Sequence, residues 1–209
     1  RTDLFEVPQE GYLSYRIPCI VVSRTGTVLA FTSARRAVSD WADIDLMLRV
    51  GCGKVSAGRP AEAESLLNRV LTQRPASAET HHCLGRAQLA SGSNLSLALR
   101  TLEHAVELDP HRAEYHLYVG WAANEAGRVA VAEQALKRAL ELDQGLGDAY
   151  WQRGVLRYRQ GAIRDAVVDL TRSLELRPGR HEAHASLAEA YFDLGEEQKA
   201  LVEWKRAVT

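Results

Sequence analysis

Small and apolar residues recur at helical spacing over most of the chain, and the whole pattern repeats with a period of 34 residues. The repeat is clearest after residue 94, and one more unit before that point fits the same pattern through Gly51, Gly58, Ala63, Leu67 and Pro75. Self-similarity at this period is typical of solenoids and predicts about five units over residues 44–209. The recurring positions are Gly127, Gly161 and Gly195; Ala98, Ala132, Ala166 and Ala200; and the bulky Leu102, Leu136, Leu170 and Trp204.

Each unit has the same internal order, which predicts a helix hairpin. One helical apolar pattern is followed by a glycine-containing turn, a second helical pattern and a residue that ends it, such as Pro110, Gln144 or Pro178. A small residue recurs in the first pattern, as at Gly120 and Gly154. We expect these small residues to let the two helices of a hairpin approach closely, while the bulky position packs against the neighbouring hairpin.

The first 43 residues differ from the rest, because β-branched and aromatic residues replace the strong helix formers. Segments 15–22 and 28–32 predict two strands, joined by a glycine-containing hairpin turn at 24–27. We therefore expect a short β segment over residues 1–43 and a separate helical domain over residues 44–209.

The helical part resembles the tetratricopeptide repeat family. The last two units match the family pattern best, through residues such as Tyr150, Gly154, Ala166 and Pro178. Arg153 stands where the family usually has leucine, which weakens one unit but not the assignment. The resemblance implies a mainly α fold: a right-handed α-solenoid of about five helix hairpins, preceded by the short β segment.

The N-terminal part resembles the opening blade of a sialidase. The resemblance rests on the Tyr-Arg-Ile-Pro sequence at residues 15–18 and on the segments around Gly26, Arg35 and Asp40. It implies that Arg16 helps to bind a sialic acid carboxylate, that Arg35 contacts the sugar ring, and that Asp40 protonates the leaving oxygen.

The chain is too short for that activity. A propeller blade takes about 40–45 residues, so the chain holds about one blade before the helical repeats begin. The remaining clamp arginines and the nucleophilic residues cannot be placed after residue 49. We expect no enzyme activity, and the alternative to a pure repeat protein is a catalytically incomplete portion of a sialidase fused to the repeats.

The two resemblances disagree over Ile44–Gly51. This segment is a third strand in the sialidase interpretation and the first helix in the repeat interpretation. Because the downstream positions Gly58, Ala63, Leu67 and Pro75 keep phase with a helix, we favour a helix here.

A solenoid of helix hairpins binds partners on the concave face lined by the first helix of each unit. Large aromatic side chains with a polar group are common at binding hot spots. The hypothesis is therefore a non-catalytic scaffold that binds an extended or helical peptide, and the alternative is that the tryptophans only fill space between repeats. The proposed peptide-binding residues are Arg86, Tyr118, Trp121, Trp151, Tyr158 and Arg159, with His82, Asn124, Gln152, Glu189 and Phe192 at other inner positions.

Charge and hydropathy argue against two classes of partner, nucleic acids and membranes. Lys and Arg number 26 against 27 Asp and Glu, a net charge of −1, which argues against nucleic acid as the main partner. No apolar run approaches the ~18 residues of a membrane span, so we expect no membrane partner and a cytoplasmic location. The first residue is Arg1, which leaves a removed signal sequence open. We also expect another copy of the chain, a neighbouring molecule or further residues to cover the uncapped last repeat.

The cysteines and histidines predict no metal or cofactor. Cys19, Cys52 and Cys83 are odd in number and widely spaced, so they are interpreted as buried reduced thiols. The pairs His81-His82 and His181/His184 lack further ligands at zinc spacing, and we expect them to be structural or solvated.

Overall fold

The computed structural model describes residues 19–22, 28–31, 39–92 and 94–208. The chain divides into two compact units, Arg1–Leu46 and Met47–Thr209. The domain boundary expected near residue 43 stays a prediction, because little of the first unit lies within the described residues.

In the first unit, strands β1 (Cys19–Val22) and β2 (Val28–Phe31) pair in an antiparallel ribbon. The register places Cys19 opposite Phe31 and Val22 opposite Val28. The two strands agree with the described part of the predicted hairpin, and its turn at 24–27 lies outside the described residues.

Helix α1 (Ser39–Ser56) runs without interruption through Ile44–Gly51. The helical interpretation of this segment is confirmed, and the third strand that the sialidase resemblance implies there is wrong. The physical reason is the one expected from the sequence: the bulky and small positions keep the helical phase of the downstream repeats, and Gly51 packs against Leu67, which is fully buried.

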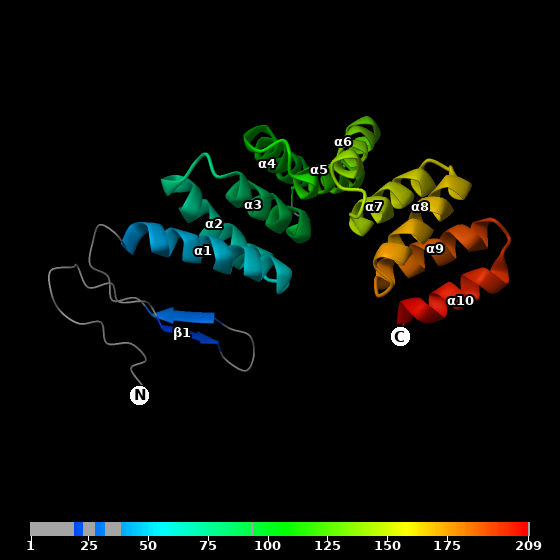
Figure 1. Ribbon diagram of the computed structural model, residues 1–209, viewed down its shortest axis with the longest axis horizontal. Coiled ribbons are helices and arrows are strands. Elements are labelled where there is room, and N and C mark those ends of the chain that lie inside the picture. The colour runs from blue at the N-terminus through cyan, green and yellow to red at the C-terminus, as the bar shows by residue number, and fades with distance from the viewer. Residues whose placement is uncertain (1–18, 23–27, 32–38, 93, 209) are drawn as a thin grey trace. The chain divides into compact units, whose positions relative to one another are not determined.

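The second unit consists of helix hairpins that follow one another along the chain (Figure 1). From α3 onward, each first helix packs most extensively on the second helix of its own hairpin, and each second helix before the last also packs on the first helix of the next hairpin. The helices after α1 are α2 (Pro60–Gln73), α3 (Ala78–Ser91), α4 (Leu95–Leu108), α5 (Ala113–Glu125), α6 (Val129–Leu142), α7 (Gly147–Arg159), α8 (Ile163–Leu176), α9 (His181–Asp193) and α10 (Glu197–Val208).

The hairpins close through a glycine in the first helix and a buried leucine in the second. A Cβ atom added at Gly120 of α5 would lie only 2.6 Å from Cγ of Leu136 in α6. Leu136 is fully buried, as are Leu102 and Leu170 at the equivalent positions of α4 and α8. The expected close approach of the two helices is confirmed. The bulky position was expected against the neighbouring hairpin, and this is corrected: Leu102, Leu136 and Leu170 pack on the glycine of their own hairpin, because the missing Cβ leaves the space that they fill.

The turn between the two helices of a hairpin depends on a glycine with left-handed backbone conformation. Gly127, between α5 and α6, has φ of +68°, which glycine adopts without the steric cost that other residues incur. The turn is closed by backbone hydrogen bonds from Gly127 to the Asn124 carbonyl, at 3.1 Å, and from Arg128 to the Ala123 carbonyl, at 2.8 Å.

The first helices form one face of the second unit. Helix α3 contacts α5, α5 contacts α7, and α7 contacts α9, whereas the described second helices make no comparable contacts with each other. The first helices are therefore closer together than the second helices, which makes their side the inside of the curve. We call the surface formed by α3, α5, α7 and α9 the inner face.

The last hairpin departs from the expected packing. Trp204 of α10 occupies the position of the buried leucines but is 39% exposed, and its ring lies 5.7 Å from that of the exposed Phe192. Ala188 of α9 stands at the position that Gly120 and Gly154 occupy in earlier hairpins. Apart from α9, no described helix packs on α10. Coverage of this surface by another copy or by further residues stays a prediction.

Cys52 and Cys83 are joined by a disulfide that connects α1 to α3, with the two Cα atoms 5.3 Å apart. The expectation of reduced thiols is wrong for these two residues. The two cysteines lie on successive first helices, on the sides that face one another. Their spacing along the chain does not show this proximity, because it depends on how the helices pack. Among the described helices, none combines the length and apolar character that a membrane crossing needs.

Candidate functional site

Five aromatic side chains form a continuous row of ring contacts across the inner face. His82 of α3 stacks on Tyr115 of α5 at a centroid distance of 4.5 Å and meets Tyr118 edge-on at 5.0 Å. Tyr118 and Trp121, one helical turn apart on α5, stack at 5.6 Å, and Trp121 meets Trp151 of α7 edge-on at 5.6 Å. We call these five residues the aromatic row.

The row is partly exposed, because Tyr118, Trp121 and Trp151 are half-buried while His82 and Tyr115 are buried. Aromatic pairs at these distances and angles are favourable beyond the area that they bury. The two tryptophans therefore pack between repeats and also present ring surface to solvent, so the two interpretations of these residues are compatible.

Guanidinium groups lie over three rings of the row, and the most distant of them is Arg112, 6.0 Å from the Tyr115 centroid. The Arg86 guanidinium carbon is 4.8 Å from the Tyr118 ring centroid, and that of Arg180 is 4.0 Å from the Trp151 centroid. Such cation–π contacts are worth about 0.5–2 kcal/mol, depending on desolvation. The row thus already accepts cations from the protein itself.

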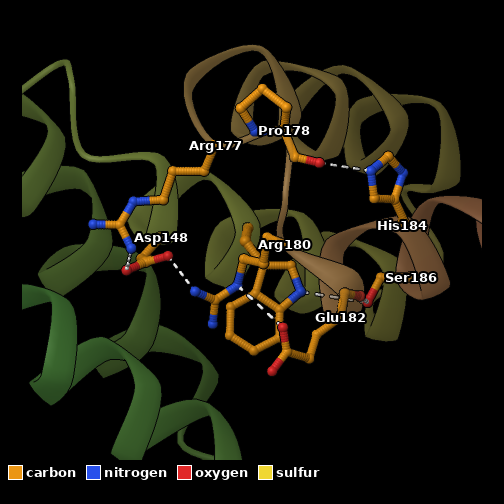
Figure 2. A network of polar contacts seen from close by, with 8 residues as sticks. Asp148, Arg177, Pro178, Arg180, Glu182, His184 and Ser186 are labelled. Atoms are coloured by element: carbon orange, nitrogen blue, oxygen red, sulfur yellow. Dashed lines mark hydrogen bonds and ion pairs between the residues drawn. The ribbon is translucent and has the colours of Figure 1, made fainter. Parts of the chain in front are cut away.

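Arg180 belongs to a polar network at the α7–α9 end of the row (Figure 2). Asp148, in the first turn of α7, accepts hydrogen bonds from Arg180 and from Arg177, the latter at 2.7 Å. The Trp151 indole Nε1 donates to Ser186 Oγ of α9 at 3.4 Å. This network holds Trp151 between a guanidinium face and a hydroxyl, which fixes the ring orientation.

At the other end, His82 faces Glu114, with 3.5 Å between Nε2 and Oε1, a separation too long for a good hydrogen bond. Burial lowers the pKa of His82, against an opposing contribution from the Glu114 carboxylate and with a smaller lowering by Arg86. The contact with His82 is also the main cause of a lowered pKa at Glu114. His82 is therefore a neutral, buried ring at neutral pH.

The His82 environment predicts an acid-sensitive fold. The folded state binds the His82 proton more weakly than the unfolded chain, so stability is retained above the ordinary histidine pKa of about 6.5 and is lost as the pH falls below it. The free energy of unfolding, measured by urea titration, is expected to fall between about pH 7.5 and 5.5, and to fall less in His82→Phe. An equal fall in both proteins would contradict this role of His82.

The other two proposed residues, Tyr158 and Arg159, lie in the last turn of α7 and are not in ring contact with the row within the described residues. Tyr158 donates a hydrogen bond to Asp193 of α9 at 2.6 Å, and this bond is the main cause that raises the pKa of Tyr158 to about 12. Arg159 donates to the Asn124 carbonyl and side chain and pairs with Glu125 of α5 at 3.1 Å. The structure therefore brings Arg86, Tyr118, Trp121 and Trp151 together and places Tyr158 and Arg159 in separate contacts between helices.

Comparison of the chain with known protein families identifies the family of its helical unit. Two family models, both described as tetratricopeptide repeat, match residues 54–116 and 152–208. The helical unit is a tetratricopeptide repeat solenoid. No curated protein sequence matches the chain significantly.

Solved structures share the TPR solenoid. A crystal structure of MamA is 26% identical with a TM-score of 0.61 and covers 76% of this chain and 92% of its own. TTC0263, a thermophilic TPR protein of Thermus thermophilus, is 24% identical with a TM-score of 0.70 and covers 79% of this chain and 90% of its own. Pseudomonas aeruginosa pilF is 19% identical with a TM-score of 0.69 and covers 81% of this chain and 77% of its own. The last two show the fold alone.

None of these comparisons supports the sialidase resemblance. Arg16 and Arg35 lie outside the described residues, as does the side chain of Asp40, which falls in helix α1. TPR domains are generally non-catalytic interaction scaffolds, which agrees with the expectation that this chain is not an enzyme.

Sequence reasoning missed the residues that anchor the row. Arg180 and Asp148 act through contacts between units. The available signal was only an acidic residue in the first turn of each first helix from α3 to α9: Glu79, Glu114, Asp148 and Glu182. A second missed feature is a histidine six residues after a proline. His81, His116 and His184 each place Nε2 2.9 Å from the carbonyl of that proline, so Nε2 donates there.

These hydrogen bonds give His81 and His184 structural partners. His184 is buried and also lies 2.6 Å from Glu203 through Nδ1. Over the described ranges, 39–92 and 94–208 included, no group of three or more histidine, cysteine or carboxylate side chains is placed to hold a metal ion.

Proposed function

We propose that the TPR solenoid is a scaffold that binds an extended or helical peptide segment of a partner protein along its inner face. The observation that supports this most is the aromatic row, which crosses three successive first helices and leaves Tyr118, Trp121 and Trp151 partly open to solvent. Half-buried tryptophan and tyrosine offer large contact area at low entropic cost, which is the composition of binding hot spots.

The inner face does not have the chemistry of a carboxylate clamp. In some TPR proteins a lysine and an asparagine on successive first helices bind a C-terminal carboxylate. Here the corresponding positions carry Leu48 and Cys52, Cys83, Glu114 and Tyr118. Cys52 and Cys83 are joined to each other by the disulfide. The proposed site is therefore an aromatic surface rather than an anion site.

Removing the two tryptophans of the row tests the proposal. Peptides of about 12 residues, which span about 40 Å when extended, are selected from a displayed random library on the wild-type protein. In Trp121→Ala/Trp151→Ala we expect their affinity, measured by fluorescence anisotropy, to fall at least about 100-fold, or about 2.7 kcal/mol, because two hot-spot rings are lost.

The control is Val129→Ala/Val168→Ala, which removes two exposed apolar side chains from the second helices α6 and α8, away from the inner face. It should leave peptide affinity unchanged, and both variants should keep the helical circular dichroism of the wild type. Unchanged affinity in the double variant, or failure to enrich any peptide, would sink the proposal.

The cytoplasmic location expected from the sequence stays a prediction. The Cys52–Cys83 disulfide favours an oxidising compartment, because disulfides are rare in reducing ones.

A further inference from the structure

Carboxylates outnumber cations on the inner face. The first helices and the loop before α9 place Arg86, Arg159 and Arg180 on this face, and Arg177 of the same loop pairs with Asp148 there. The other two arginines of α7, Arg153 and Arg157, pair with the buried Asp169 of α8. The carboxylates that helical phase places on the inner side of α3, α5, α7 and α9 are Glu79, Glu114, Glu125, Asp148, Glu182, Glu189 and Asp193. The near-neutral charge of the whole chain therefore hides a negative inner surface.

Arg86, Arg159 and Arg180 each already face carboxylates of the same chain. Arg180 is held by Asp148, Arg159 lies 3.1 Å from Glu125, and Arg86 lies 3.9 Å from Glu114 while it covers Tyr118. Paired and stacked guanidiniums offer little to an acidic ligand.

Three inner-face carboxylates lack a basic partner within the described residues: Glu79, Glu189 and Asp193, all exposed. Two of them, Glu189 and Asp193, lie four residues apart on α9 and so share one helix face. That face also carries Phe192, which is 55% exposed, and Asp193 reaches Tyr158 of α7. Two carboxylates and two rings thus gather at the α7–α9 end of the inner face.

The electrostatics of α9 disfavour negative charge at the positions of these two carboxylates. Glu189 and Asp193 lie at the C-terminal end of α9, where the helix dipole favours cations, and as like charges four residues apart they repel each other. Their charges also contribute to the raised pKa of Tyr158, which reports a negative field at this end. Asp193 is compensated in part by the hydrogen bond from Tyr158, whereas Glu189 makes no such bond within the described residues. Residues that break a local rule in this way are expected at functional sites.

The rings here have no cation of their own. Arg86 and Arg180 cover Tyr118 and Trp151, whereas no guanidinium or ammonium within the described part of the chain lies over Trp121, Tyr158 or Phe192. A cation placed beside Tyr158 and Phe192 would meet aromatic faces together with two carboxylates that lack a basic partner, the combination that favours lysine or arginine side chains.

We infer that the partner segment is basic, with lysine or arginine side chains that bind at Tyr158, Glu189, Phe192 and Asp193 while its apolar side chains lie along the aromatic row. The inference rests on the proposed peptide-binding function of the same face and specifies the charge of the ligand. Because these contacts are exposed and electrostatic, binding weakens as salt rises.

The probes are three fluorescein-labelled peptides of about 12 residues that share alternating leucine and tyrosine positions and differ only in carrying lysine, glutamine or glutamate between them. With the wild-type protein, the lysine peptide is expected to bind at least about tenfold more tightly than the glutamine peptide, and the glutamate peptide more weakly still. Raising NaCl from about 50 to about 300 mM should remove most of the difference.

Glu189→Gln/Asp193→Asn should weaken the lysine peptide at least about tenfold and leave the glutamine peptide unchanged. The matched control, Glu141→Gln/Glu175→Gln, removes the same charge from the second helices α6 and α8 and should leave both affinities unchanged. Because the amide oxygen in Asp193→Asn can still accept the Tyr158 hydrogen bond, and Glu189 makes no such bond within the described residues, thermal stability of the inner-face variant should fall only slightly.

The two proposals fail in different ways. Equal binding of the three peptides, tightest binding of the glutamate peptide, absence of lysine-peptide binding, or an equal loss in the control pair overturns the basic-partner inference. In that case the proposed peptide-binding function still stands if the library peptides lose affinity in Trp121→Ala/Trp151→Ala. If those library peptides keep their affinity, the proposed function itself fails.

Discussion

Replacing Gly120 with leucine is expected to lower the free energy of unfolding by about 3 kcal/mol, the upper end of the usual cost of overpacking a core. A Cβ atom at this position would lie 2.6 Å from Leu136 Cγ and 3.4 Å from the Leu136 backbone nitrogen. Leu136 is fully buried, so its side chain has no space into which to move. Leucine is also a better helix former than glycine by about 1 kcal/mol, so any net loss reports the broken contact between α5 and α6.

The matched control is the same substitution at Gly53 of α1, where an added Cβ meets nothing within 4 Å. Gly53→Leu should raise stability by up to about 1 kcal/mol through helix propensity alone. Both variants are measured by urea unfolding followed by circular dichroism. A Gly120→Leu protein as stable as Gly53→Leu would show that the two helices are not in close contact.

Loss of the Cys52–Cys83 disulfide is expected to lower the free energy of unfolding by about 3–4 kcal/mol. The bond joins residues 31 apart in sequence, and loop-closure entropy for a loop of that length gives this magnitude in the chain-entropy model. The effect should appear in Cys52→Ser/Cys83→Ser and, to a similar extent, in the wild type treated with a reductant.

Two measurements separate this effect from the cost of the serines. Reductant should not change the stability of the double variant, since its bond is already absent. Peptide mapping after alkylation should show Cys52 and Cys83 protected before reduction and modified after it. Alkylation of both residues in the untreated native protein would contradict the disulfide.

The hairpins and the close approach of their two helices could be predicted from the sequence because they depend on residues that lie close in the chain, although the bulky residue was expected against the neighbouring hairpin. The glycine of a first helix and the leucine of the second are about 16 residues apart, and their repetition at a constant period identifies them. The same local signal decided correctly that residues 44–51 are helical. It did not explain Arg153, whose guanidinium pairs with the buried Asp169 of α8 through two 2.7 Å hydrogen bonds.

The candidate site was predicted in part. Helical phase placed Arg86, Tyr118, Trp121 and Trp151 on the inner face, because phase decides which side of a helix a residue occupies. Phase does not give the distance between residues on different helices. It therefore missed Arg180 over Trp151, the hydrogen bond from Tyr158 to Asp193, and the pairing of Arg159 with Glu125.

The sequence by itself determined the repeat period, the helix pairs, the recurring small and large positions and the face on which the aromatic residues lie. All of these follow from the periodicity of one chain segment. Only the tertiary structure decided which side chains of successive units meet: the Cys52–Cys83 bond, the order of rings in the aromatic row, and the carboxylates left without a cation. The reason is that contacts between first helices depend on the offset between neighbouring hairpins, and packing across the whole core sets that offset.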